Sequence, residues 1–311
     1  MIVVGGENLI DFIQVPSDGG HPLYRAIPGG SPFNTAKAIV RQGQATGYLT
    51  PFSDDTLGQV LREDLLRDPV VVLSADSPRP TSLAVVSLTD GQARYQFYRE
   101  GTAERDITLD GLTAALPDQV SAFYVGSLAV TDGPDAEVWS TLFARLSDQG
   151  VFCAFDPNIR PAFIHDRAAY MDRFETLITQ AALVKLSDED MDWLFPGEDM
   201  DTALADIHQR SGAGLAVLTR GGDGAVAMHA TGRHEVPVVA VPDLKDTVGA
   251  GDTFMGSLVA GCLREGWRSR DLLAAAGADQ IRDLLQLSAK AAAINCGRVG
   301  CDPPTLAELM D

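Results

Sequence analysis

Short apolar runs alternate with longer amphipathic or small-residue segments along most of this chain. Runs rich in β-branched and aromatic residues predict buried strands at residues 2–5, 46–51, 121–126, 151–156, 183–186 and 215–219. The segments between and after them predict helices at residues 32–42, 57–66, 134–147, 168–180, 202–209, 253–264 and 281–296. This alternation is typical of an α/β doubly wound fold, in which helices cover both faces of a mostly parallel sheet.

Two stretches interrupt the alternation. Residues 81–88 and 92–99 predict strands around Thr89-Asp90-Gly91, a sequence that favours a hairpin turn. Residues 12–15 and 24–27 also have the pattern of extended chain. The sequence therefore predicts a second, smaller β-structure beside the main sheet.

Composition and charge narrow the choice of partners. The chain has 311 residues, a length that can form one large domain or two smaller ones, and 45% of its residues are hydrophobic. Its formal net charge is −19, so we expect no nucleic acid and no anionic membrane as partner. A polyanion would need local donors and a cation to bind. No apolar run approaches the roughly 18 residues of a membrane span, so we expect a soluble, cytoplasmic protein.

The cysteines and histidines give no clear metal site. Cys153 and Cys262 lie in apolar segments and are expected in the core. Cys296 and Cys301 are close enough in sequence to leave a disulfide or a metal site open, although no histidine or second cysteine pair supports it. The five histidines are scattered, so a zinc site is not predicted.

The clearest chemical signal is the run from Asp246 to Gly256. Gly249-Ala250-Gly251 offers backbone N–H groups with little side-chain bulk, and an apolar helix is predicted directly after it. Donors at a helix N-terminus favour an anion. An acid at Asp252 would weaken anion binding unless it accepted a proton from a hydroxyl that attacks the anion. The run predicts phosphoryl transfer to an alcohol; the alternative is a plain strand-to-helix turn with a capping acid.

Three further segments carry a family resemblance. Gly29-Gly30-Ser31-Pro32-Phe33-Asn34-Thr35-Ala36-Lys37-Ala38 resembles the first signature of the ribokinase-like (PfkB) carbohydrate kinases, and the run from Asp246 resembles their second. Thr219-Arg220-Gly221-Gly222-Asp223-Gly224 resembles their nucleotide-binding Thr-x-Gly-x-x-Gly, and residues 4–11 resemble their first strand. The resemblance spans essentially the whole chain. It implies a ribokinase-like α/β core of residues 1–11, 29–80 and 100–311 with a β lid of residues 12–28 and 81–99.

The resemblance also implies roles for individual residues. Asp252 would be the general base, and Gly249, Ala250 and Gly251 would form the anion hole. The sugar would be bound by Asp11, Gly30, Asn34, Arg99 and Arg160. The nucleotide would be bound by Thr219, Gly221, Gly224 and Asn295. For Asn34 a hydrogen bond within its own helix stays open, and for either arginine a surface salt bridge stays open.

Cations follow from the same resemblance. ATP with Mg²⁺ is expected, although the family's Asn-x-x-Glu is replaced by Ser187-Asp188-Glu189-Asp190, so that either Glu189 or Asp190 would face the Mg²⁺ water shell. A potassium ion would be held by the Asp246 carboxylate and by the carbonyls of Val248, Asn295 and Gly300. Pro304 stands where ribokinases offer a serine.

The acceptor is expected to be fructose. Residues 291–305 and Asp156-Pro157-Asn158-Ile159-Arg160-Pro161 resemble bacterial fructokinases more than ribokinases. The alternatives are 2-keto-3-deoxygluconate, ribose, and a sugar-binding regulatory protein of the same fold. The lid would cover the sugar, and its apolar face, formed by Tyr24, Leu83, Tyr95 and Phe97, could also be the contact of a homodimer.

Overall fold

The computed structural model describes residues 1–16, 19–89 and 92–311 and contains two sheets. The larger sheet has the strand order β13-β12-β11-β10-β9-β8-β1-β4-β5. Its parallel strands are β1 (Ile2–Val4), β4 (Thr46–Tyr48), β5 (Val71–Val72), β8 (Ala122–Gly126), β9 (Phe152–Asp156), β10 (Leu183–Ser187) and β11 (Leu215–Thr219). The antiparallel hairpin of β12 (Ala225–His229) and β13 (Gly232–Val236) ends one edge. The predicted, mostly parallel α/β sheet is confirmed.

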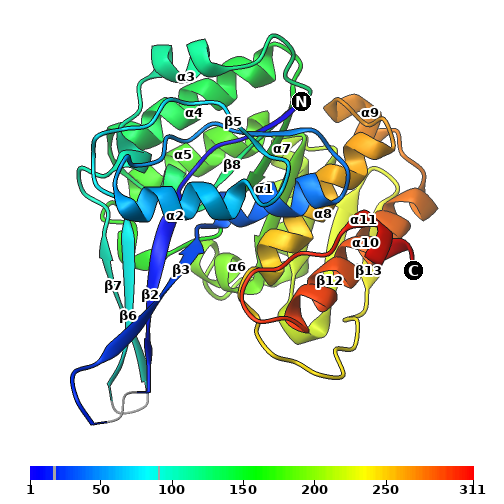
Figure 1. Ribbon diagram of the computed structural model, residues 1–311. Helices are drawn as coiled ribbons and strands as arrows, with labels where there is room; N and C mark the ends of the chain where they lie inside the picture. The colour runs from blue at the N-terminus through cyan, green and yellow to red at the C-terminus, as the bar shows by residue number, and fades with distance from the viewer. Residues whose placement is uncertain (17–18, 90–91) are drawn as a thin grey trace.

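Helices cover both faces of this sheet (Figure 1). One face packs against α1 (Ser31–Arg41), α2 (Thr56–Leu65), α8 (Ala250–Arg264), α9 (Arg270–Ala274) and α10 (Ala278–Cys296). The other packs against α3 (Leu109–Ala115), α4 (Gly133–Asp148), α5 (Arg167–Gln180), α6 (Asp188–Leu194) and α7 (Met200–Ser211). Helix α11 (Leu306–Met310) lies near the C-terminus. Each predicted helix and strand is present, with ends displaced by a few residues.

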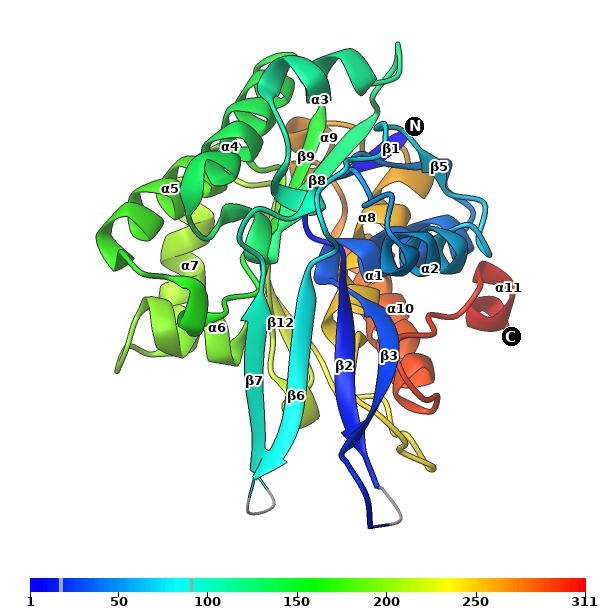
Figure 2. The ribbon, with the colours of Figure 1, turned by 60° about the vertical axis from the view of Figure 1, so that its left-hand side comes forward.

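The smaller sheet has the order β3-β2-β6-β7 and extends from the body (Figure 2). Strand β2 (Leu9–Val15) is antiparallel to β3 (Leu23–Gly29) and parallel to β6 (Leu83–Thr89), which pairs with β7 (Gln92–Tyr98). Asp90 and Gly91 of the expected turn lie outside the described residues. Strand β2 begins within the segment expected to belong to the core, and the proposed division into domains stays a prediction.

The predicted apolar face of the small sheet is only partly open. Tyr24 is 39% exposed, whereas Leu83 and Phe97 are half-buried. The Phe97 ring packs edge-on against Phe163, with 4.4 Å between the ring centroids. The side chain of Tyr95 lies outside the described part of the structure.

Unusual backbone conformations mark one edge of the large sheet. Among the described residues, Ser127 (φ 56°) and Asn158 (φ 36°) are the non-glycine residues with positive φ. Each follows the carboxyl end of a parallel strand, β8 or β9. Strained backbone of this kind concentrates at functional sites, and doubly wound sheets bind ligands at this edge.

The structure also bears on membrane spans and on disulfides. No helix in the part of the chain that the structure describes is long and apolar enough to cross a membrane. The four cysteines are free thiols, and Cys153 and Cys262 are buried as expected. Cys296 and Cys301 form no disulfide.

Candidate active site

Asp252 lies in the first turn of α8 and is held by two side chains of α1. The helix begins at Ala250, after Gly249 in the left-handed conformation (φ 73°). The Asp252 Oδ1 accepts a hydrogen bond from Ser31 Oγ at 2.6 Å, and its Oδ2 accepts one from Asn34 Nδ2 at 2.8 Å. Burial raises the pKa of Asp252, and hydrogen bonds from Ser31 and Asn34 oppose that rise. Asp252 is thus a fixed carboxylate with increased proton affinity.

Close helix packing brings the two signature segments together. A Cβ added at Gly256 in α8 would lie 2.6 Å from the Cβ of Ala38 in α1. The small residues at this crossing let the N-terminal turns of α1 and α8 meet. Asn34 therefore binds Asp252 rather than its own helix backbone. Ser31, which sequence reasoning did not single out as a site residue, is the second clamp of the same carboxylate.

The two glycines of the predicted anion hole differ in what surrounds them. A Cβ at Gly249 would lie 2.3 Å from Cys301 Sγ, in a backbone conformation that favours glycine. A Cβ at Gly251 would have only Lys185 Nζ near it, at 3.5 Å. The fold therefore requires glycine at 249, whereas the space beside Gly251 is open.

Asp11 and the glycine turn before α1 lie together. A Cβ at Gly29 would approach Asp11 Oδ2 to 2.5 Å, and one at Gly30 (φ 114°) would approach the Glu7 carbonyl oxygen to 2.6 Å. The Ser31 backbone N–H donates to Glu7 Oε1 at 3.1 Å. Burial raises the pKa of Asp11 to about 6 and that of Glu7 to about 7. Glu7, a buried acid behind the turn, was not among the predicted site residues.

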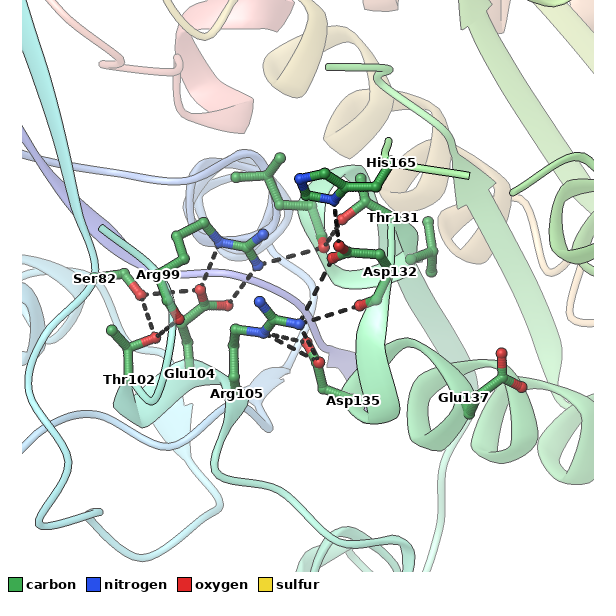
Figure 3. A network of polar contacts seen from close by, with 12 residues as sticks. Ser82, Arg99, Thr102, Glu104, Arg105, Thr131, Asp132, Asp135, Glu137 and His165 are labelled. Carbon is green, nitrogen blue, oxygen red and sulfur yellow. Dashed lines mark hydrogen bonds and ion pairs between the residues drawn. The ribbon is translucent and has the colours of Figure 1, made fainter. Parts of the chain in front are cut away.

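The two predicted sugar-binding arginines lie in different environments. Arg99 is buried and donates from Nε to Glu104 Oε1 at 2.8 Å and from Nη2 to Glu104 Oε2 at 3.2 Å (Figure 3). It also donates to the carbonyl of Leu128. The Arg99 guanidinium is therefore neutralised by a buried carboxylate, and the pair is not a surface salt bridge.

Arg160 is exposed and donates to the carbonyls of Asn158 and Ile159. Its charge lowers the pKa of Asp252, against the larger effect of burial. Of the two arginines, Arg160 is the one without an acidic partner among the described residues.

The predicted nucleotide segment follows β11 at the same edge of the sheet. The Thr219 hydroxyl donates to the carbonyl of Leu186 at 3.2 Å. Gly224 (φ 84°) has no room for a side chain, because a Cβ there would lie 2.3 Å from the Val236 carbonyl oxygen. A Cβ at Gly221 (φ 48°) meets nothing within 4 Å. The segment is thus a narrow turn with one open side, and its binding of nucleotide stays a prediction.

The residues predicted to hold potassium form one hydrogen-bonded cluster. Asp246 accepts the backbone N–H groups of Val248 at 3.0 Å and Gly300 at 2.9 Å. Asn295 donates to the Val248 carbonyl at 2.8 Å and accepts from the Asp302 N–H at 2.9 Å. The segments before α8 and after α10 are therefore tied together beside the predicted anion hole.

Asp190 has a different environment from the one expected for a residue at a metal. Its two carboxylate oxygens accept the backbone N–H groups of Ile159 at 2.6 Å and Ser187 at 2.8 Å. Ser187 and Asp190 form a capping box at the start of α6, while Glu189 is exposed. Within residues 1–16, 19–89 and 92–311, no group of three or more His, Cys, Asp or Glu side chains could hold a metal. A place of Asp190 or Glu189 in the Mg²⁺ water shell stays a prediction.

Comparison with known proteins agrees with this geometry. The model of the pfkB family carbohydrate kinases matches residues 1–308. This chain belongs to that family. It is 39% identical to a fructokinase of Rhizobium leguminosarum bv. trifolii over 264 residues, 84% of this chain and 79% of the relative. It is 29% identical to fructokinase-2 of Zea mays, across 100% of this chain and 93% of the relative.

A solved structure is similar to nearly the whole chain. The crystal structure of a fructokinase with bound ATP from Xylella fastidiosa has a TM-score of 0.86 and 26% identity to this chain, covering 99% of this chain and 96% of that one. The ribokinase-like fold expected from the sequence is thereby confirmed.

Proposed function

We propose that this protein transfers the terminal phosphoryl group of ATP to a primary hydroxyl of fructose. The observation that carries the proposal is the buried Asp252 carboxylate at the N-terminus of α8, beside the open space at Gly251. A base and a set of anion donors at one helix terminus are what phosphoryl transfer to an alcohol requires. The names of the relatives support fructose as the acceptor.

The proposed reaction assigns one task to each group. The sugar hydroxyl oxygen attacks the terminal phosphorus, the bond from that phosphorus to the ADP oxygen breaks, and Asp252 accepts the hydroxyl proton. The backbone N–H groups of Gly249 and Gly251 would bind the phosphoryl oxygens, whereas that of Ala250, expected to take part, donates to the Thr247 carbonyl at 3.2 Å. Asp11 and Gly30 face the sugar, and Asn34 holds Asp252 in place besides contacting the acceptor.

Nucleotide and cations are proposed for the opposite side of the anion hole. Thr219, Gly221, Gly224 and Asn295 would line the nucleotide site. Mg²⁺, when bound, would neutralise charge on the ATP phosphates and keep most of its water ligands. The proposed potassium site is supported by the Asp246 carboxylate, which hydrogen bonds tie to the segments of Val248 and Gly300, and by the Val248 carbonyl, which Asn295 holds in the same cluster.

The arginines bear on which sugar is accepted. A sugar acid would need an arginine charge that no protein carboxylate neutralises, and Arg99 is paired with Glu104. The pairing of Arg99 leaves Arg160 as the one of these two arginines that could meet the carboxylate of a sugar acid, so the choice of fructose over 2-keto-3-deoxygluconate rests on the names of the relatives. Arg160, exposed and near Asp252, is then available to the transferred phosphoryl group.

The test is a coupled ADP-release assay with fructose, ribose, glucose, 2-keto-3-deoxygluconate and adenosine as acceptors. We expect the highest kcat/KM with fructose. A higher kcat/KM with 2-keto-3-deoxygluconate or ribose would reject fructose and leave the kinase chemistry in place. Sugar binding without turnover of any acceptor would favour a regulatory protein.

We also propose a homodimer formed through the small sheet. Strand β3 is an edge strand of that sheet, and it carries Leu23, which is 52% exposed, beside Tyr24. Exposed apolar residues on an unpaired edge favour association. In sedimentation, the wild type should be a dimer and Leu23→Asp should be a monomer; a monomeric wild type would contradict the proposal.

The expected cytoplasmic location stays a prediction, which cell fractionation would test.

A further inference from the structure

Lys185 and Asp156 form a buried ion pair near the carboxyl ends of β10 and β9. The Lys185 Nζ lies 2.9 Å from Asp156 Oδ2, and the two side chains are 4% and 1% exposed. Desolvating both charges is costly, and apolar residues of similar volume often stabilise a fold at least as well. The pair therefore indicates a task other than stability.

The lysine faces the first turn of α8. Side chains alternate along β10, and Leu183 packs in the cluster that contains α8, whereas Val184 and Leu186 pack on the opposite face. Lys185 therefore lies on the side of α8. A Cβ at Gly251 would lie 3.5 Å from its Nζ, with no other group outside that turn of the helix within 4 Å. The ammonium thus borders the open space of the predicted anion hole.

The surrounding charges keep this ammonium protonated. Burial lowers the pKa of Lys185, but the carboxylates of Asp156, Asp190 and Asp252 outweigh burial and raise it. The chain as a whole carries a net charge of −19, so a polyphosphate needs a local cation. In this low-dielectric interior, a fixed ammonium interacts with an anion more strongly than an exposed one.

We propose that Lys185 is a catalytic residue whose ammonium contacts the phosphoryl group during its transfer, and that Asp156 positions it. This inference rests on the proposed kinase function. Lys185 donates hydrogen bonds to the phosphoryl oxygens and keeps its proton throughout. The proton of the acceptor hydroxyl goes to Asp252, the new bond joins the acceptor oxygen to phosphorus, and ADP leaves with the electrons of the broken bond. Because Gly251 has no side chain, the phosphoryl group can lie between the first turn of α8 and the Lys185 ammonium.

The test compares Lys185→Met with Lys37→Met. Lys37 also forms a largely buried ion pair, 2.7 Å from Asp64, between α1 and α2. We expect Lys185→Met to lower kcat by roughly 10²–10³, the range for losing one preorganised donor, with little change in the affinities for ATP and sugar. The acid limb of its kcat–pH profile should move to higher pH, because Asp252 loses a positive neighbour. Lys37→Met should lower the melting temperature but leave kcat and its pH profile unchanged.

A double variant separates catalysis from folding. Asp156→Leu with Lys185→Met replaces the buried ion pair by two apolar residues and should melt near the wild-type temperature, while kcat stays as low as in Lys185→Met. Lys185→Arg should recover part of the lost kcat. Retention of more than about a tenth of wild-type kcat in the folded double variant would overturn the role of Lys185, whereas a wild type inactive toward every acceptor would overturn the kinase function as well.

Discussion

The two glycines of the proposed anion hole should respond to alanine in opposite ways. Gly249 has φ 73°, and its added Cβ would lie 2.3 Å from Cys301 Sγ and 2.6 Å from Cys301 Cβ. A left-handed residue with a side chain costs about 1–2 kcal/mol, and overpacking costs about 1–3 kcal/mol. Gly249→Ala should therefore lower the free energy of unfolding by roughly 2–5 kcal/mol, the sum of these two effects.

Gly251→Ala should leave the fold intact. The nearest group to its added Cβ is Lys185 Nζ at 3.5 Å, an ordinary contact distance. Alanine is also favoured over glycine within a helix by up to about 1 kcal/mol. The methyl group would nevertheless occupy the space proposed for the phosphoryl group, and we expect kcat to fall by roughly 10²–10³.

The assay is a thermal melt together with steady-state kinetics on the same preparations. At about 2–4 °C per kcal/mol for a chain of this size class, Gly249→Ala should melt roughly 4–20 °C below the wild type. Gly251→Ala should melt within about 2 °C of the wild type or slightly above it, since its helix is not weakened. The reasoning is refuted if Gly251→Ala loses folded fraction and activity in equal measure, or if it keeps nearly full kcat.

Four further substitutions test the surrounding groups. Asp252→Asn should lower kcat by about 10²–10⁴, as for loss of a general base, with sugar and ATP binding kept, measured by kinetics and calorimetry. Burial raises the pKa of Glu7 to about 7, so the free energy of unfolding should fall as pH rises between about 4.5 and 7, because the unfolded chain releases this proton first. Glu7→Gln should reduce that slope in urea titrations, most clearly between about pH 6 and 7, because the pKa of Asp11 is also raised, to about 6; an unchanged slope would contradict the assignment. Arg99→Ala leaves Glu104 buried and unpaired and should cost about 3–5 kcal/mol in urea titration, whereas Arg160→Ala should lower kcat with an unchanged melting curve.

The sequence by itself predicted the parallel strands of the large sheet other than β5, most of the helices and the residues proposed to carry the chemistry. The strands of the parallel sheet are buried on both faces and give continuous apolar runs, and the helices between them have a clear 3.6-residue period. Strands β12 and β13 were not predicted: β13 is polar in part and lies at the edge of the sheet, whereas β12 is an apolar strand as long as β11 that the sequence analysis missed. Two-residue β5 and short helices such as α9 and α11 give too few positions for a period to be recognised.

Only the tertiary structure decided how these residues meet. Ser31 and Asn34 clamp Asp252 although they lie 221 and 218 positions away in the chain, because α1 and α8 cross at small residues. Arg99 was expected to bind the sugar; the fold pairs it with Glu104, and its contact with a sugar stays a prediction. Lys185 lies within an apolar strand, and nothing local indicates that it borders Gly251. Periodicity is a property of neighbouring residues, whereas a catalytic contact depends on which strand ends and helix termini the chain brings together.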